Sequence, residues 1–171
     1  HGTPAASAAI ESMIALIDET IVTVRRVATE LRPAILDDFG FRAALELELA
    51  GLQKRSGVKH SIHFSPPGLE IDREHATTLY RIVQESLTNV ARHAGATFVS
   101  VSVDLHGDSI VLEIADNGRG ISPDELSHSS SLGIIGIRER AFEHGGDADV
   151  RRGADGGTVV SVRLPVIGAS G

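Results

Sequence analysis

The feature that most constrains this chain is a helical segment, residues 79–94, paired with a glycine-containing turn at residues 114–121. Apolar side chains recur at helical spacing in the first segment, at Leu79, Ile82, Val83, Leu87, Val90 and Ala91. Glu85 and Asn89 lie one helical turn apart, with two basic residues one turn further on, so all four follow one side of the helix. Opposite a glycine-rich turn that carries Asp116, this side is suited to holding a nucleotide and its metal.

Composition and charge exclude several other classes of protein. The 171 residues are 42% hydrophobic and 23% charged, which is typical of a soluble globular domain with an appendage. The net charge of −7 argues against broad binding to nucleic acid or anionic membranes. The absence of cysteine removes disulfides and thiolate chemistry and fits a cytosolic protein. No apolar run approaches the roughly 20 residues that a membrane-spanning helix needs.

Residues 8–31 carry a narrow apolar seam that predicts helix-on-helix packing. Its members alternate spacings of four and three, at Ile10, Ile14, Ile17, Ile21, Val24, Ala28 and Leu31. A coiled coil or half of a helical bundle explains this seam best, and the alternative is an amphipathic helix lying on its own domain's core. Pro33 ends the helix, because the residue before a proline is biased away from the helical region.

The elements expected after Pro33 alternate between helices and strands. We expect a helix at 41–55, an edge strand at 59–64, a helix at 72–93, strands at 97–105 and 109–115, a helix at 133–143, and strands at 148–151 and 158–164. The strands at 97–105 and 109–115 are joined by Gly107-Asp108 and should be antiparallel neighbours. Residues 122–131 are polar and without periodicity, which predicts a mobile loop.

Four short motifs in this order resemble the ATP-binding domain of sensor histidine kinases. Glu85–Ala94 is similar to the family's N box, Asp116–Gly120 to its G1 box, Leu132–Arg140 to its G2 box, and Gly156–Thr158 to its final Gly-Thr. The superfamily also includes gyrase, the heat-shock ATPase chaperones and MutL, and the resemblance covers about residues 58–165. Arg138–Ala141, together with residues 31–33 and 36–45, resembles the nitrate-sensor and desaturase-sensor class.

The resemblance implies an α/β fold of two layers. A mixed, mainly antiparallel sheet would carry helices on one face, as in Bergerat-type ATP-binding domains, with a helical dimerisation segment before it. We therefore expect a partial dimerisation segment at 1–57 and the catalytic domain at 58–171. In that class two helices form a dimeric bundle, and the first carries the phosphorylated histidine in a Glu-Leu-His-Asp motif. No such motif occurs here, so the 8–31 helix resembles the second bundle helix and the phosphoacceptor helix is missing.

The resemblance also implies a role for each motif residue. Asn89 would be the magnesium ligand, and Glu85 would orient a metal-bound water or act as general base. Asp116 would accept a hydrogen bond from the adenine amino group. The expected ATP-binding residues are Asn89, Arg92, His93, Asp116, Gly118, Gly120, Ile121, Leu132, Gly133, Gly136 and Thr158.

Plainer structural roles remain open for several of these residues. Asn89 and Glu85 would otherwise be solvated side chains on a helix surface. Asp116 would otherwise stabilise an Asp-Asn-Gly turn, and the glycines would be ordinary turn formers. For His93 a structural role stands beside contact with the phosphates.

The expected function is that of the C-terminal catalytic fragment of a two-component sensor histidine kinase. It would bind Mg-ATP, and the full-length homodimer would transfer the γ-phosphoryl group to a histidine and then to the receiver domain of a response regulator. The fragment alone should not autophosphorylate, because the acceptor helix is missing. We expect it to be the cytosolic portion of a soluble or membrane-bound sensor, without nucleic-acid partners. Two alternatives are an anti-sigma-type protein serine kinase and a nucleotide-binding dimerisation module without transferase activity.

Overall fold

The structure is a computed structural model that describes residue 13, residues 34–127 and residues 132–166. The chain divides into two compact units, His1–Pro33 and Ala34–Gly171. The seam expected at residues 8–31 lies outside the described residues, apart from Met13. The account below concerns the second unit.

The second unit alternates helices and strands much as the sequence predicts. Its elements are α2 (Ala34–Ser56), β1 (Lys59–Ser65), α3 (Arg73–Asn89), a π-helical turn (Val90–Ala94), β2 (Phe98–His106), β3 (Ser109–Asp116), α4 (Pro123–Ser127), α5 (Leu132–Glu143), β4 (Asp147–Arg152) and β5 (Thr158–Pro165). Asp72 caps the N-terminus of α3, where its side chain accepts from the backbone N–H groups of Glu74 and His75. Within the described part of the chain, no helix is long and apolar enough to cross a membrane.

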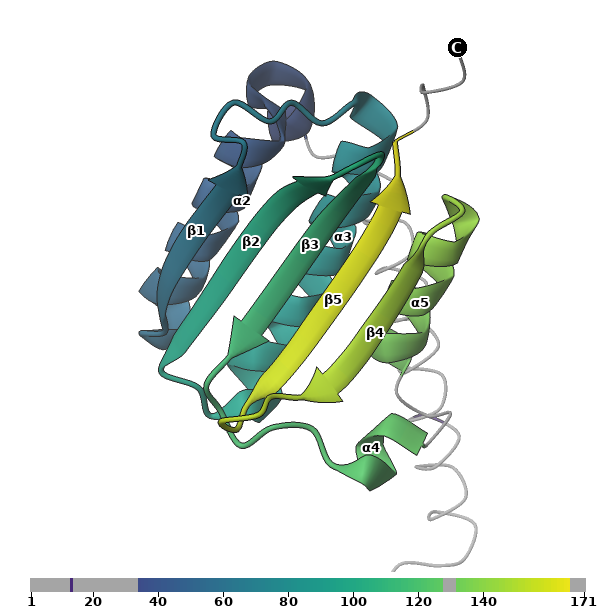
Figure 1. Ribbon diagram of the computed structural model, residues 1–171. Helices are drawn as coiled ribbons and strands as arrows, with labels where there is room; N and C mark the ends of the chain where they lie inside the picture. Colours follow the sequence, from purple (N-terminus) through teal and green to yellow (C-terminus); the bar gives the residue numbers. More distant parts are fainter. Residues whose placement is uncertain (1–12, 14–33, 128–131, 167–171) are drawn as a thin grey trace, which may run out of the picture. The chain divides into compact units, whose positions relative to one another are not determined.

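The five strands form one mixed, twisted sheet in the order β1-β2-β3-β5-β4 (Figure 1). The edge strand β1 pairs in parallel with β2, and every other neighbouring pair is antiparallel. The β2–β3 hairpin pairs Val101 with Ile114 and Val103 with Leu112. The predicted α/β fold, with a mainly antiparallel sheet, is therefore confirmed. The strand that comes last in sequence, β5, occupies an interior position between β3 and β4.

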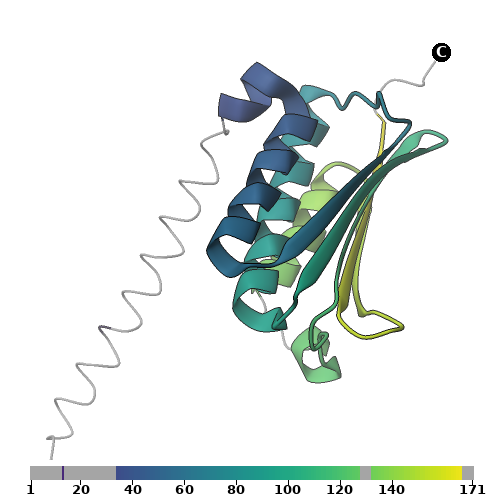
Figure 2. The same cartoon turned by 90° about the vertical axis from the view of Figure 1, so that its left-hand side faces the viewer.

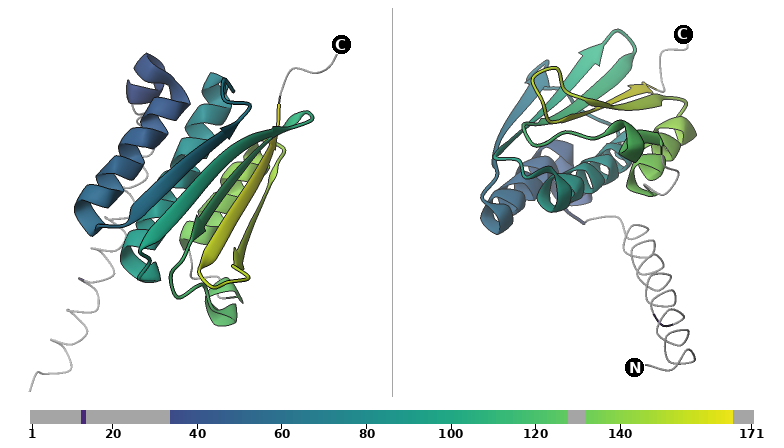
Figure 3. Two further views of the ribbon diagram at one scale, coloured as in Figure 1. Left: turned by 60° about the vertical axis from the view of Figure 1, so that its left-hand side comes forward. Right: turned by 90° about the horizontal axis from the view of Figure 1, so that it is seen from below.

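Helices α2, α3 and α5 cover one face of the sheet, as the side view in Figure 2 shows. Alternate residues of each central strand point toward these helices and are buried, among them Val99, Val101 and Val103 of β2. The helices supply Leu45, Leu49, Leu79, Ile82 and Ile137, all at most 1% exposed. One aliphatic core thus joins the two layers, and Figure 3 shows the helices side by side beneath the twisted sheet.

Helix α2 belongs to this core. Leu36, Phe41, Leu45, Leu49 and Leu52 are each at most 5% exposed and lie in the same hydrophobic cluster as the sheet. The packing places Ala34–Ser56 with the residues that follow, so the compact unit begins before the boundary expected between residues 57 and 58. The helix expected at 41–55 follows a break within α2 at Gly40, which has φ 77° and ψ 178°.

The segment expected to be a loop from 122 to 131 begins with a short helix. Pro123–Ser127 forms α4, which corrects the expectation for these five residues. Ser122 and Glu125 exchange two hydrogen bonds, from Ser122 N–H to the Glu125 carboxylate and from Glu125 N–H to the Ser122 hydroxyl. This reciprocal capping box begins α4 with Pro123 as its first residue. Residues 128–131 lie outside the described part of the chain.

Candidate functional site

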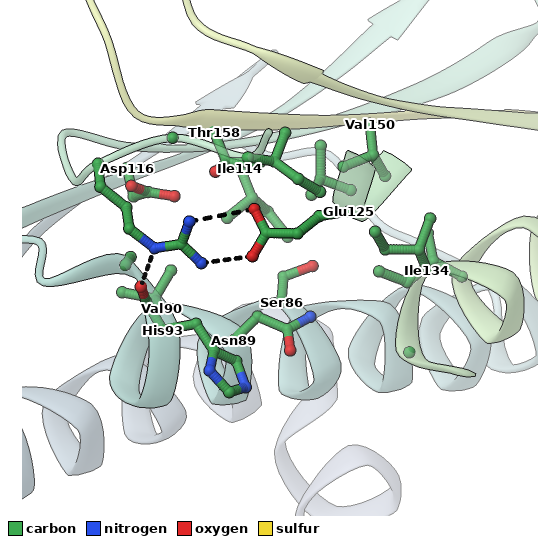
Figure 4. A pocket seen from close by; sticks show the side chains of 17 residues that line it. Ser86, Asn89, Val90, His93, Ile114, Asp116, Glu125, Ile134, Val150 and Thr158 are labelled. Carbon is green, nitrogen blue, oxygen red and sulfur yellow. Dashed lines mark hydrogen bonds and ion pairs between the residues drawn. The ribbon is translucent and has the colours of Figure 1, made fainter. Parts of the chain in front are cut away.

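A cavity of about 360 Å³ opens at the end of the sheet where β3 ends and β5 begins. Its volume lies within the usual range of small-molecule pockets. It is lined by Ser86, Asn89, Val90, His93, Ala94, Ile114, Asp116, Arg119, Gly120, Ile121, Glu125, Gly133, Ile134, Ile137, Val150, Thr158 and Val160. Figure 4 shows Asn89 and His93 on the α3 side, with Ile114, Val150 and Thr158 on the sheet side.

The α3 side of the cavity ends in an irregular turn. The helix changes from α to π geometry at Val90–Ala94 and stops at Gly95, which has the left-handed φ of 60°. Single π turns inside helices often mark functional positions. Here the turn carries His93, whose side chain is exposed and lines the cavity, one turn after Asn89. The N box therefore ends with its last residues turned toward the cavity mouth.

The turn after β3 is held by hydrogen bonds from its own polar side chains. The Asp116 carboxylate accepts from the Gly118 N–H at 2.7 Å, which fixes the orientation of the carboxylate. Asn117 accepts from the N–H groups of Thr97 and Phe98 at 2.9 Å, and so ties the turn to the start of β2. Asp116 therefore stabilises the Asp-Asn-Gly turn, which is the plainer role left open for it by the sequence. It also lines the cavity.

Two glycines in this region allow backbones to touch. A Cβ at Gly118 would collide with the Ala94 carbonyl, and a Cβ at Gly157 would collide with the Asp116 carbonyl. Gly157 also has a φ of 72°, which disfavours any residue with a side chain. Main chain from the π-helical turn, the end of β3 and the residue before β5 is thus in direct contact beside the cavity.

The N-terminal turn of α5 closes the cavity opposite the G1 turn. Gly133 and Ile134 line it, and a Cβ at Gly133 would collide with Oε1 of Glu85 on α3. The Glu85 carboxylate therefore lies against the first turn of α5, where unpaired N–H groups favour negative charge. Glycine at position 133 makes this approach possible.

An ion pair crosses the mouth of the cavity. The Arg119 guanidinium donates to both carboxylate oxygens of Glu125, at 2.5 and 3.0 Å, and its Nε donates to the His93 carbonyl at 2.8 Å (Figure 4). The hydrogen bond from Arg119, followed by the backbone N–H of Ser122, lowers the pKa of Glu125 to about 2. The pair raises the pKa of Arg119 in turn. Both groups are therefore charged throughout the physiological pH range.

The structure brings together most of the residues that the sequence singled out. Seven of them line the cavity: Asn89, His93, Asp116, Gly120, Ile121, Gly133 and Thr158. Five do not: Glu85, Arg92, Gly118, Leu132 and Gly136. Among these five, Glu85 touches the cavity's edge through Gly133, whereas the side chains of Arg92 and Leu132 are exposed. The binding role of each remains a prediction.

Sequence reasoning missed two groups of lining residues. Ile114, Ile134, Ile137, Val150 and Val160 form an apolar wall contributed by β3, α5, β4 and β5. Their periodicity marks them only as core residues, which gives no sign of a cavity beside them. Arg119 and Glu125 were missed as well, although Ser122-Pro123-Asp124-Glu125 has the spacing of a capping box, a signal that could have revealed α4.

Comparison with known proteins agrees with this geometry. The profile described as histidine kinase-, DNA gyrase B- and HSP90-like ATPase matches residues 74–167. The oxygen sensor histidine kinase NreB of Staphylococcus carnosus is 32% identical over 154 residues, which is 90% of this chain. The chain spans 43% of the length of that relative.

Solved structures share the fold. The histidine kinase domain of the blue-light activated kinase of Erythrobacter litoralis has a TM-score of 0.60 at 24% identity, over 74% of this chain and 61% of that one. The ATP-binding domain of PrrB from Mycobacterium tuberculosis has a TM-score of 0.57 at 22% identity, over 72% of this chain and 91% of that one. The profile match, the relative and the shared fold lead to one assignment. The chain belongs to the histidine kinase-, DNA gyrase B- and HSP90-like ATPase family, as a catalytic domain of the sensor histidine kinase type.

Proposed function

We propose that the cavity between α3, α5 and the sheet binds Mg-ATP. The observation that carries this proposal is the pairing of an apolar wall with a fixed carboxylate at one end and an amide at the other. The wall of isoleucine and valine side chains fits the flat faces of a purine. Membership in an ATPase family makes ATP the expected nucleotide.

Asp116 is the group we assign to the adenine. One of its carboxylate oxygens is held by the Gly118 N–H, so the carboxylate is positioned before any ligand arrives. A carboxylate only accepts hydrogen bonds, so it matches the amino group of adenine and opposes the carbonyl of guanine. Thr158 lines the same region and is the second polar group assigned to the base.

Asn89 and Glu85 are the groups we assign to magnesium. Among the described residues, no cluster of three or more His, Asp, Glu or Cys side chains could hold a metal by itself. Magnesium that arrives with a nucleotide needs few protein ligands, because phosphates and waters fill most of its coordination sites. Asn89, which lines the cavity, and Glu85 at its edge therefore fit this ion, which would neutralise phosphate charge.

The full-length protein would then be a protein histidine kinase. The γ-phosphoryl group would pass to a histidine on a dimerisation helix and from there to the receiver domain of a response regulator. The relative above, which is a sensor histidine kinase, supports this reaction over transfer to a serine. We place the domain in the cytoplasm, where ATP is available.

Calorimetry of the chain with ATP and GTP tests the nucleotide assignment. We expect Mg-ATP to bind in the micromolar to millimolar range, roughly −4 to −8 kcal/mol. Asp116→Asn replaces a carboxylate, which only accepts hydrogen bonds, with an amide whose NH₂ group would face the amino group of adenine. The affinity for ATP should therefore fall by about tenfold or more. Equal affinity of wild type and variant would remove Asp116 from the site.

Radiolabelled ATP tests the reaction. The chain alone should gain no acid-labile, base-stable phosphate, because phosphoryl transfer needs an acceptor held in line with the phosphorus. Addition of a polypeptide that carries the missing acceptor helix should restore labelling on that helix. Stoichiometric labelling of a histidine within this chain would contradict the assignment.

A further inference from the structure

The ion pair between Arg119 and Glu125 occupies the space that a ligand must enter. Both residues line the cavity, and Figure 4 shows the Glu125 carboxylate pointing into it between Ile114 and Ser86. The Arg119 side chain links the π-helical turn to α4. Its Nε donates to the His93 carbonyl, and its Nη groups donate to Glu125. An anionic group of a molecule that fills the cavity between the sheet and α3 therefore comes close to this pair.

Arg119 is held ready for an anion by its backbone and side chain. Its N–H donates to the Ala94 carbonyl at 2.8 Å, and its Nε donates to the His93 carbonyl at 2.8 Å. These two bonds fix the base of the side chain against the π-helical turn and leave the two Nη groups directed at a carboxylate. Arginine presents the same planar pair of donors to a phosphate as to a carboxylate.

Glu125 belongs to a short element and is partly exposed. It sits on α4, a five-residue helix, where its carboxylate also accepts from the Ser122 N–H at 2.8 Å. The side chains of Arg119 and Glu125 are 53% and 40% exposed, and ion pairs at such positions are weak enough to exchange partners. Glu125 carries negative charge at the place where an incoming polyphosphate would add more.

We propose that Arg119 is a phosphate-binding residue of the site and that Glu125 occupies its guanidinium until the polyphosphate of the nucleotide displaces it. This inference rests on the proposed function and extends it to two residues that carry no expected role in the sequence, Arg119 within the G1 box and Glu125 beyond it. Exchange of a carboxylate for a phosphate keeps the guanidinium paired in both states. It makes the affinity depend on the phosphates rather than on the base, because Glu125 competes only with an anion.

The test is calorimetry of the whole chain with Mg-ATP and with adenosine. Glu125→Gln keeps the size of the side chain and an oxygen for the Ser122 N–H but removes the competing charge. It should raise the affinity for Mg-ATP by about two- to fivefold, the factor associated with one exposed ion pair. Arg119→Ala should lower that affinity by at least about tenfold, the cost of charge-assisted bonds to a phosphate. Adenosine should bind wild type and both variants equally.

Two matched variants control for charge and for folding of α4. Glu113→Gln makes the same change in an ion pair outside the cavity, where Glu113 of β3 lies 3.7 Å from Arg151 of β4, and it should leave Mg-ATP affinity unchanged. Ser122→Ala weakens the cap of α4 without a change of charge and should also leave it unchanged.

Several results would overturn the proposal. A Glu125→Gln affinity equal to or below that of wild type would show that Glu125 does not compete. If Ser122→Ala raised the affinity for Mg-ATP as much as Glu125→Gln does, fraying of α4 and not the loss of charge would explain the increase. If Arg119→Ala lowered the affinity for adenosine as much as the affinity for Mg-ATP, Arg119 would be assigned to the base. Failure of wild type to bind Mg-ATP at all would instead contradict the proposed function.

Discussion

The two ends of helix α3 use the same kinds of side chain for opposite purposes. At the N-terminal end, His75 is 1% exposed and both its ring nitrogens face protein oxygens, Asp72 Oδ2 at 2.5 Å and the Pro165 carbonyl at 3.0 Å. At the C-terminal end, His93 is exposed and its side chain faces the cavity. Polar groups at the first end are satisfied by the fold, whereas those at the second end surround a space.

The N-terminal end forms a closed polar cluster. His144 of the α5–β4 connection lies with its ring 5.9 Å from that of His75, and its Nε2 is 2.6 Å from the Thr78 hydroxyl. The cluster joins the start of α3 to the end of β5 and the end of α5. A buried polar network of this kind stabilises one arrangement of the elements when each member has a partner. At the cavity end, polar side chains such as Asn89 border an open space, so they can bind a ligand.

Gly157→Ala should give the largest effect, because it breaks the cavity end through the backbone. The left-handed φ of 72° and the collision with the Asp116 carbonyl should together cost about 3 kcal/mol or more of unfolding free energy. Gly107→Ala is the matched control at the β2–β3 turn, where φ is 58° and nothing lies within 4 Å of an added Cβ. It should cost only about 1 kcal/mol in urea denaturation. Equal losses would show that the contact with Asp116 is unimportant.

His75→Ala comes next and tests the closed end directly. Removal of the buried ring leaves a cavity and takes away a hydrogen-bond partner of the Asp72 carboxylate and of the Pro165 carbonyl, at a cost of about 2–4 kcal/mol. His93→Ala is the same change at the open end and should alter stability by less than about 0.5 kcal/mol. Thermal unfolding of both variants would measure the two losses of stability. A larger loss in His93→Ala than in His75→Ala would reverse the comparison.

Asn89→Ala should affect binding rather than stability. We expect about a tenfold weaker affinity for ATP in the presence of magnesium, or ~1.4 kcal/mol, and no difference between variant and wild type in EDTA. Thr88→Ala is the control on the same helix, because the Thr88 hydroxyl donates to the Gln84 carbonyl and Thr88 is not among the residues that line the cavity. A magnesium-independent loss would assign Asn89 to the nucleotide rather than to the metal.

Asp72 should give the smallest effect and one that depends on pH. Burial of its carboxyl opposes ionisation, but hydrogen bonds from the backbone and the ring of His75 outweigh this and lower its pKa. The ionised form is thus favoured by folding, so this contribution to stability is present at neutral pH and is lost as the pH falls below about 4. The unfolding free energy of Asp72→Asn should be lower than that of wild type at pH 7. The difference should shrink at pH 3, as urea titrations at both values would show.

The sequence predicts the fold well because its signals are local. The alternation of Val99, Val101 and Val103, and the helical spacing of Leu79, Ile82 and Val83, place the elements within a few residues of where they lie. The four short motifs also predict which segments meet. The packing of α2 against the sheet is harder to predict, because the partners of Leu45 and Leu49 lie far along the chain.

The site is less predictable than the fold, since its properties arise where distant segments meet. Periodicity identifies His75 and His93 only as residues on one helix, and it does not distinguish the buried one from the exposed one. That difference arises from Pro165, ninety positions away, whose carbonyl faces His75. Likewise, Arg119 and Glu125 belong to a polar segment whose short helix depends on two reciprocal hydrogen bonds. In the sequence, Ile134 and Val150 look like ordinary core residues, and only the packing of α5 and β4 shows that they line the cavity.

The interior position of β5 has a consequence for the order of assembly. Thr158 and Val160 line the cavity, yet their strand is the last of the sheet to be synthesised. Before β5 inserts, β3 and β4 have no common neighbour, so a partly folded chain has an incomplete sheet and no cavity. Pairings of long sequence separation form slowly. A ligand of this cavity therefore recognises only the fully assembled domain, and its binding shifts the folding equilibrium toward that state alone.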